Sequence, residues 1–163
     1  MLSIVDSFGL IGINGYKVKV EVDINRGLPS FDVVGLADTA IKESKQRVRS
    51  AIKNLGLDFP INKITINLAP ADTKKEGSFY DLPIAIGILT ATGQAILKNI
   101  KEYAFIGELS LDGSIRKING VLPMLITARE LGIKNIFIPY DNKKEASYIE
   151  GLNIYAVKTL KEV

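Results

Sequence analysis

The side chains best placed for chemistry lie within residues 63–85, where a predicted buried strand, a loop and the start of a buried helix follow one another. Ser78 is the candidate nucleophile, because a helix N-terminus can stabilise an oxyanion close to it. Lys74 and Lys75 are near it in sequence and could complete a Ser–Lys pair. Two bulky aromatic residues follow Ser78 and crowd the approach of a substrate. The residues therefore favour a loop or capping serine over a nucleophile.

Three carboxylates lie near the same junction, at Asp72, Glu76 and Asp81. A solvated loop accounts for Asp72 and Glu76. Asp81 stands directly before Leu82-Pro83, where its carboxylate is predicted to accept hydrogen bonds from the free amides of the first helical turn. We therefore expect neither a metal site nor an acid–base pair here.

The composition excludes several classes of site. The chain has no cysteine and no histidine, which removes disulfides, thiol nucleophiles, histidine-based triads and the commonest zinc ligands. Neither glycine-rich phosphate-binding pattern, G-x-x-x-x-G-K-[ST] or G-x-G-x-x-G, occurs. No apolar run reaches membrane-spanning length, and the N-terminus lacks the pattern of a signal peptide. We expect a cytoplasmic protein without membrane contact.

A basic face is predicted on a helix from about residue 39 to 54. Lys42, Lys45, Arg49 and Lys53 follow one another at offsets of three, four and four, which places them on one side of a helix. Such a face can contact nucleic-acid phosphates with little sequence preference. A cationic helix face is more often simply solvated, and the formal net charge of +3 does not decide between the two readings.

The elements expected around these residues form one mixed sheet covered by helices. Alternating apolar residues predict an antiparallel pair, Leu2–Ile13 and Tyr16–Ile24, joined by a turn at Asn14-Gly15. Further strands are predicted at 30–34, 64–69, 135–138 and 152–157. Further helices are predicted from the loop after Ser78 to about 92, at 120–131 and at 141–149, the last capped by Asp141. A hairpin is predicted at 104–118, with its turn at Asp112-Gly113. The predicted class is α+β (mixed α/β), in a single domain of residues 1–163. Because Thr159–Val163 resembles the start of a helix, we expect a fragment of a longer chain.

Several short motifs, in the order in which they occur, resemble a known family. They are Arg26-Gly27-Leu28-Pro29-Ser30-Phe31, Val34-Gly35-Leu36-Ala37-Asp38-Thr39-Ala40, Glu43-Ser44, Arg47-Val48-Arg49, Ile66-Asn67-Leu68-Ala69-Pro70-Ala71-Asp72, Lys75-Glu76-Gly77, Asp81-Leu82-Pro83-Ile84-Ala85 and Gly107-Glu108-Leu109-Ser110-Leu111-Asp112-Gly113. Together they resemble the N-terminal domain of the bacterial Mg-chelatase-like AAA+ ATPases of the ComM/YifB type. The resemblance covers essentially the whole chain.

This resemblance implies a fold like the proteolytic domain of Lon, which is a ribosomal protein S5 domain 2-like fold. It implies that an AAA+ ATPase module follows, and that ATP and Mg bind in that module, with no cofactor in this domain. Members form hexameric rings, and competence-type members act in DNA branch migration during natural transformation. The implied partners are the chain's own AAA+ module and neighbouring subunits, with DNA as a further candidate.

The resemblance to Lon also allows a test residue by residue. The nucleophile of Lon lies in a Lys-Asp-Gly-Pro-Ser-Ala-Gly segment, and Lys75-Glu76-Gly77 matches its first three residues. Phe79 then falls on the nucleophile, whereas a slip of one residue would place Ser78 there. The lysine of Lon follows Gly-Gly-Leu, and after Asn119-Gly120-Val121 this chain has Leu122. Both members of the dyad are missing, which implies a domain without peptidase activity.

We therefore expect a non-catalytic accessory domain that engages DNA or partners and supports ring assembly in DNA branch migration. The surfaces expected to do so are the basic helix and the hairpin at Asp112-Gly113. Two alternatives remain open from the residues: a Ser–Lys peptidase that uses Ser78, and a stand-alone nucleic-acid-binding module.

Overall fold

A seven-stranded sheet forms the centre of the computed structural model, which describes residues 1–163. The strand order is β3-β4-β2-β1-β5-β8-β9, and the bounds are β1 (Leu2–Ile11), β2 (Asn14–Asn25), β3 (Ser30–Val34), β4 (Lys63–Ala69), β5 (Tyr103–Phe105), β8 (Asn135–Pro139) and β9 (Asn153–Val157). β2 runs antiparallel to β1 and β4, and the other neighbouring pairs are parallel. This mixed sheet confirms the predicted fold class.

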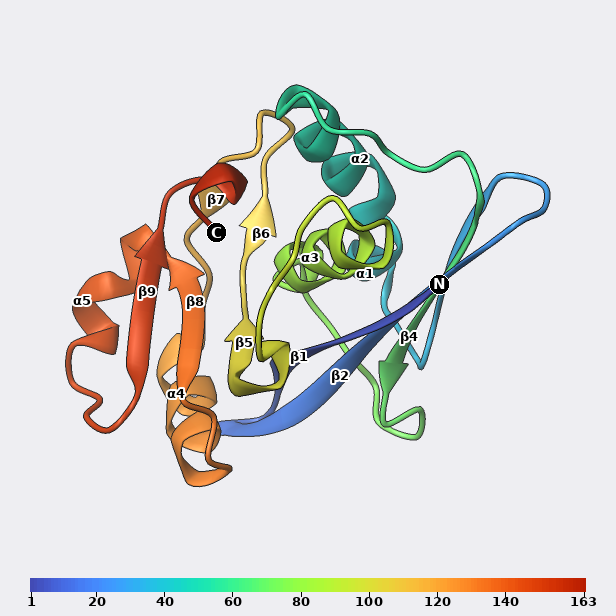
Figure 1. Cartoon of the computed structure of the whole chain (residues 1–163). Coiled ribbons are helices and arrows are strands. Elements are labelled where there is room, and N and C mark those ends of the chain that lie inside the picture. Colours follow the sequence, from blue (N-terminus) through green and yellow to red (C-terminus); the bar gives the residue numbers. More distant parts are fainter.

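Helices cover both faces of the sheet (Figure 1). They are α1 (Thr39–Lys42), α2 (Ser44–Asn54), α3 (Asp81–Ala91), α4 (Val121–Glu130) and α5 (Lys143–Ala146), with short 3-10 turns at Ile100–Glu102, Tyr140–Asn142 and Leu160–Glu162. Figure 1 shows α3 across the middle of the sheet beside α2, with α4 and α5 towards β8 and β9. No helix has the length and apolar character needed to cross a membrane.

Two apolar cores lie on opposite faces of the sheet because neighbouring strand residues point to opposite sides. In β5, Phe105 belongs to the core under α2 and α3, whereas Ala104 belongs to the core under α4 and α5. Every residue of α3 from Leu82 to Leu89 is buried, as the apolar sequence of this run predicts, and Asp81 before it is buried as well.

The first hairpin turns two residues earlier than predicted. Ile11 pairs with Asn14, so Gly12 and Ile13 form the turn and Gly15 lies within β2. Gly15 is required there by packing, because a Cβ atom would lie 2.6 Å from the Thr127 hydroxyl and 2.8 Å from a backbone oxygen of α4. The alternating valines of β2 remain buried, since the shift keeps each side chain on its face.

The predicted hairpin at 104–118 is divided between two sheets. Its first residues form β5 in the main sheet, and only β6 (Glu108–Leu109) and β7 (Ile115–Arg116) pair as a separate ladder. Asp112 does not have the positive φ that a type I′ turn needs. Its carboxylate instead accepts hydrogen bonds from the amide and hydroxyl of Ser114, at 2.9 and 2.6 Å. The turn is therefore wider than the predicted two-residue turn.

Two predicted helices also differ in extent. The helix predicted at 39–54 is interrupted at Glu43, which separates α1 from α2, and Asp38 caps α1 as predicted by accepting from the Ile41 amide at 2.9 Å. The helix predicted at 141–149 is reduced to α5, and the side chain of Asp141 does not cap it. Asn142 precedes α5 but gives no cap either, because its side chain bonds to both backbone groups of Ile118.

Candidate functional site

The N-terminus of α3 carries an ion pair between buried Asp81 and partly buried Arg47. Arg47 from α2 donates from Nε to Asp81 Oδ2 at 2.6 Å and from Nη2 to Oδ1 at 3.0 Å, and the Leu109 amide donates to Oδ2 at 3.0 Å. The predicted capping role of Asp81 is therefore wrong. Its carboxylate turns to Arg47 because the planar guanidinium matches both oxygens at once. The helix begins after Tyr80 without a capping side chain.

Burial dominates the electrostatics of this pair. It raises the pKa of Asp81 to about 6, and the hydrogen bonds from Arg47 and Leu109 offset only part of the increase. The hydrogen bond to Asp81 in turn raises the pKa of Arg47. Because the three partners come from α2, α3 and β6, the pair holds these elements together around the mouth of the helix.

Ser78 lies directly before this junction, half-buried in the loop that leads to α3. Its hydroxyl donates to the carboxylate of Glu108 in β6, with an Oγ–Oε2 distance of 2.6 Å. Ser78 makes no hydrogen bond to a lysine. This hydrogen bond to Glu108 positions the Ser78 hydroxyl against β6.

Lys75 is the unexpected feature of the loop, because its side chain is fully buried. Its Nζ donates to the carbonyl oxygen of Gly35 at 2.8 Å and to that of Pro70. Its backbone bonds to Leu36 and Asp38, so the lysine joins the loop before α1 to the loop before α3. Burial lowers the pKa of this amine. Lys74 is exposed, with Glu76 as its ion-pair partner at 3.3 Å.

Replacement of Lys75 by methionine tests this role. The change leaves two inward-facing carbonyl groups without their donor, and we expect the free energy of unfolding to fall by about 1–3 kcal/mol. Urea unfolding measures the loss, and Lys74→Met is the matched control with an expected change near zero because Lys74 is exposed. Equal stability of the two variants would contradict the role.

The two positions that align with the Lon dyad carry apolar side chains. Phe79 is half-buried, contacts both cores and lies 4.7 Å from the ring of Tyr80 at an angle of 36°. Leu122 lies half-buried in the first turn of α4. Neither side chain can accept or donate a proton, so this pair of positions offers no acid–base chemistry.

The basic face divides between two hollows. Lys45, Arg49 and Lys53 of α2 share a cavity of about 200 Å³ with the segments 29–31 and 59–62. Lys42 of α1 lies in a separate hollow of about 600 Å³ beside β3. None of the four predicted cations forms an ion pair or donates a side-chain hydrogen bond within the chain.

The sequence reasoning missed three residues of the smaller cavity: Ser30, Phe31 and Phe59. The two rings stack with centroids 6.4 Å apart. Phe31 belongs to β3 and Phe59 to the segment before β4, and these strands pair in parallel from Ser30 and Lys63 onward. The available signal was the position of the two aromatic residues, Phe31 at the start of one predicted strand and Phe59 just before the next.

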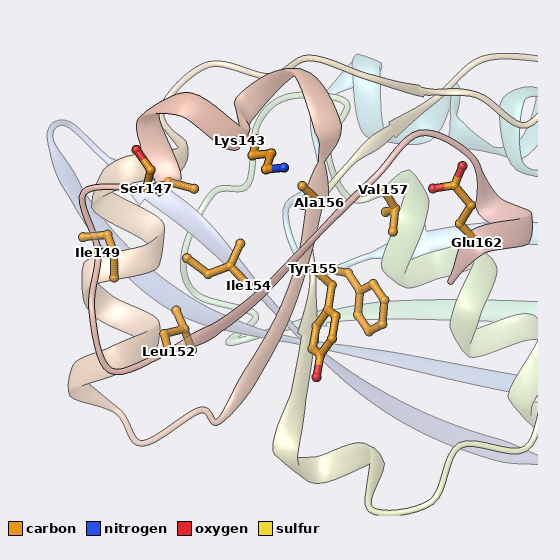
Figure 2. Close-up of a pocket in the computed structure, with 11 residues that line it drawn as sticks. Lys143, Ser147, Ile149, Leu152, Ile154, Tyr155, Ala156, Val157 and Glu162 are labelled. Atoms are coloured by element: carbon orange, nitrogen blue, oxygen red, sulfur yellow. The ribbon is translucent and has the colours of Figure 1, made fainter.

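A further hollow lies along the open edge of β9 (Figure 2). Its volume is about 590 Å³, and Ile149, Leu152 and Ile154 line its apolar part with Lys143 nearby. Tyr155 stacks on Phe137 at 4.9 Å beside it. None of the predicted site residues lines this hollow. No cluster of three or more histidine, cysteine, aspartate or glutamate side chains that could hold a metal ion is present.

Comparison with known proteins decides the family. The model of the family "subunit ChlI of Mg-chelatase" matches residues 20–142. The chain belongs to this Mg-chelatase subunit family. It is 46% identical over 150 residues to YifB of Escherichia coli, which aligns 92% of this chain with 29% of YifB. It is 41% identical over 162 residues to competence protein ComM of Haemophilus influenzae, which aligns 99% of this chain with 32% of ComM.

The Lon proteases are more distant relatives. Lon protease 2 of Bacillus subtilis is 28% identical over 180 residues, which cover 99% of this chain and 32% of the protease. The chain thus spans about a third of the length of these relatives. The comparisons confirm the resemblance to the ComM/YifB type and the Lon-like fold.

Proposed function

We propose that this chain is a non-catalytic accessory domain of a larger Mg-chelatase-like AAA+ ATPase. The observation that carries the proposal is the arrangement around Ser78. Its hydroxyl bonds to Glu108, and the buried amine of Lys75 bonds to two carbonyl oxygens, so the two groups of a Ser–Lys pair have other partners. Phe79 and Leu122 supply no replacement for either group.

The work that we propose for the domain is engagement of DNA through the basic face of α1 and α2. Lys42, Lys45, Arg49 and Lys53 support this proposal because no carboxylate of the chain neutralises them. Cations that contact phosphates release the counterions condensed on the nucleic acid, which favours binding at low salt. The name of the competence relative ComM is compatible with a role in handling DNA.

The resemblance to the family supports a proposal for the remaining partners. We propose that ATP and Mg bind in an AAA+ module of the same protein, and this proposal is supported by the chain's span of only about a third of the length of YifB and ComM. We further propose that the domain contacts that module and neighbouring subunits in a hexameric ring. The ring, on this proposal, acts in DNA branch migration and recombination.

A double charge reversal tests the DNA contact. Lys45→Glu with Arg49→Glu is expected to weaken DNA binding by about 100-fold at low salt, because attraction to phosphates becomes repulsion. Fluorescence anisotropy with a labelled oligonucleotide measures the change. Lys98→Glu with Lys144→Glu is the control, since it alters net charge equally at exposed lysines outside α1 and α2. Equal loss in both variants, or no binding by the wild type at low salt, would contradict the proposal.

A further inference from the structure

The smaller basic cavity has the charge of an anion site. Lys45, Arg49 and Lys53 are one helical turn apart on α2 and line a hollow of about 200 Å³. Their like charges repel one another, and no acidic side chain lines the hollow with them. A bound anion would relieve that repulsion.

Ser30 adds a second, independent observation. Its hydroxyl oxygen is buried without a hydrogen-bond partner, and Ser30 lines the same cavity. Buried hydroxyl groups in proteins are rarely left without a partner. Rotation of the Ser30 side chain towards the cavity would let this hydroxyl donate to a phosphate oxygen held by the three cations.

The aromatic pair decides which phosphate-bearing ligand fits. Phe31 and Phe59 are half-buried, with ring planes 27° apart, and both line the cavity beside the cations. A free base stacks on an aromatic ring, whereas the bases of a duplex are already stacked on one another. Inorganic phosphate or duplex DNA would contact the cations but would not stack on the rings.

We infer that the cavity formed by α2 and the segments 29–31 and 59–62 binds one phosphate and an adjoining unstacked base of single-stranded nucleic acid. This inference rests on the proposed function and deepens it, because it names the form of nucleic acid and the residues that distinguish it. The cations hold the phosphate, the Ser30 hydroxyl donates to a phosphate oxygen, and Phe31 and Phe59 contact the base.

The test uses fluorescence anisotropy to measure binding of the whole chain to a labelled 20-nucleotide oligothymidylate and to a labelled duplex of equal length. Phe59→Leu keeps the position apolar, and we expect it to weaken single-strand binding about tenfold and to leave duplex binding unchanged. Arg49→Gln should weaken both and make the salt dependence of single-strand binding shallower by about 0.7 in logarithmic slope. Lys144→Gln, at the opposite end of the sheet, should change neither.

The outcomes separate this inference from the proposed function. If Arg49→Gln weakens binding but Phe59→Leu changes single strand and duplex equally or not at all, the inference is wrong and the proposed DNA contact stands. If neither DNA form binds at low salt, the proposed DNA contact fails as well. Circular dichroism of each variant excludes loss of folding as the cause.

Discussion

Replacing Asp81 with alanine is expected to lower the free energy of unfolding by about 3–5 kcal/mol at pH 7. The carboxylate is 1% exposed, and its removal leaves the Arg47 guanidinium with the Ala40 carbonyl and the exposed carboxylate of Glu43, 3.9 Å away, and the Leu109 amide with no partner. The loss arises because a partly buried guanidinium loses its bidentate partner and a buried amide loses its acceptor. Urea unfolding of the wild type and the variant measures it.

A double variant separates the net contribution of the ion pair to the free energy of unfolding from the loss caused by removing only one of its partners. Arg47→Met with Asp81→Leu removes both charges, and we expect a loss of about 1–3 kcal/mol, smaller than that for Asp81→Ala, because only the Leu109 amide is left without an acceptor. The exposed pair of Lys134 and Glu102, 3.0 Å apart, is the control, and Glu102→Ala should cost less than about 1 kcal/mol. A loss below 1 kcal/mol for Asp81→Ala alone would contradict the structural role of this pair.

The stability of the domain is expected to depend on pH through the same carboxyl group. Burial raises the pKa of Asp81 from 3.8 to about 6, so the folded state binds this proton more tightly than the unfolded state does. The stability contributed by this proton is full below pH 3.8 and is lost as the pH rises through 6. The loss corresponds to about 3 kcal/mol between these limits.

Asp81→Asn isolates this contribution, because asparagine does not titrate while every other group remains. The difference in unfolding free energy between wild type and variant should therefore fall by about 3 kcal/mol from pH 3.5 to pH 7. Urea unfolding at several pH values gives the curve. A difference that is constant, or that grows as the pH rises, would show that attraction to Arg47 outweighs burial and would contradict this account.

The parts of the fold that sequence predicts well are those with regular patterns. The alternation of Val18, Val20 and Val22 predicts one buried face of β2, and the apolar run after Asp81 predicts a helix buried on all sides. The parts that fail depend on contacts that a local pattern cannot show. Gly15 has the sequence of a turn residue, yet the backbone of α4 requires a glycine at that point of the strand.

The candidate site likewise contains some features that a local pattern predicts and others that depend on distant contacts. The basic face of α2 follows from helical spacing, because that spacing is local. The pairing of Arg47 with Asp81 joins residues 34 positions apart, and the burial of Lys75 depends on the carbonyl group of Gly35 in another loop and that of Pro70 in its own loop. Charged residues in a polar loop are normally predicted to lie in water. No local pattern therefore distinguishes a buried lysine that joins two loops from an exposed one.

The measurement that tests the central claim most directly is hydrolysis of an unfolded protein by the wild type and by Ser78→Ala. If the Ser78 hydroxyl serves only to bond Glu108, neither protein cleaves the substrate above the buffer rate, and Ser78→Ala loses about 1 kcal/mol of stability with its hydrogen bond. Cleavage by the wild type that disappears in Ser78→Ala would identify a Ser-dependent peptidase and contradict the non-catalytic role.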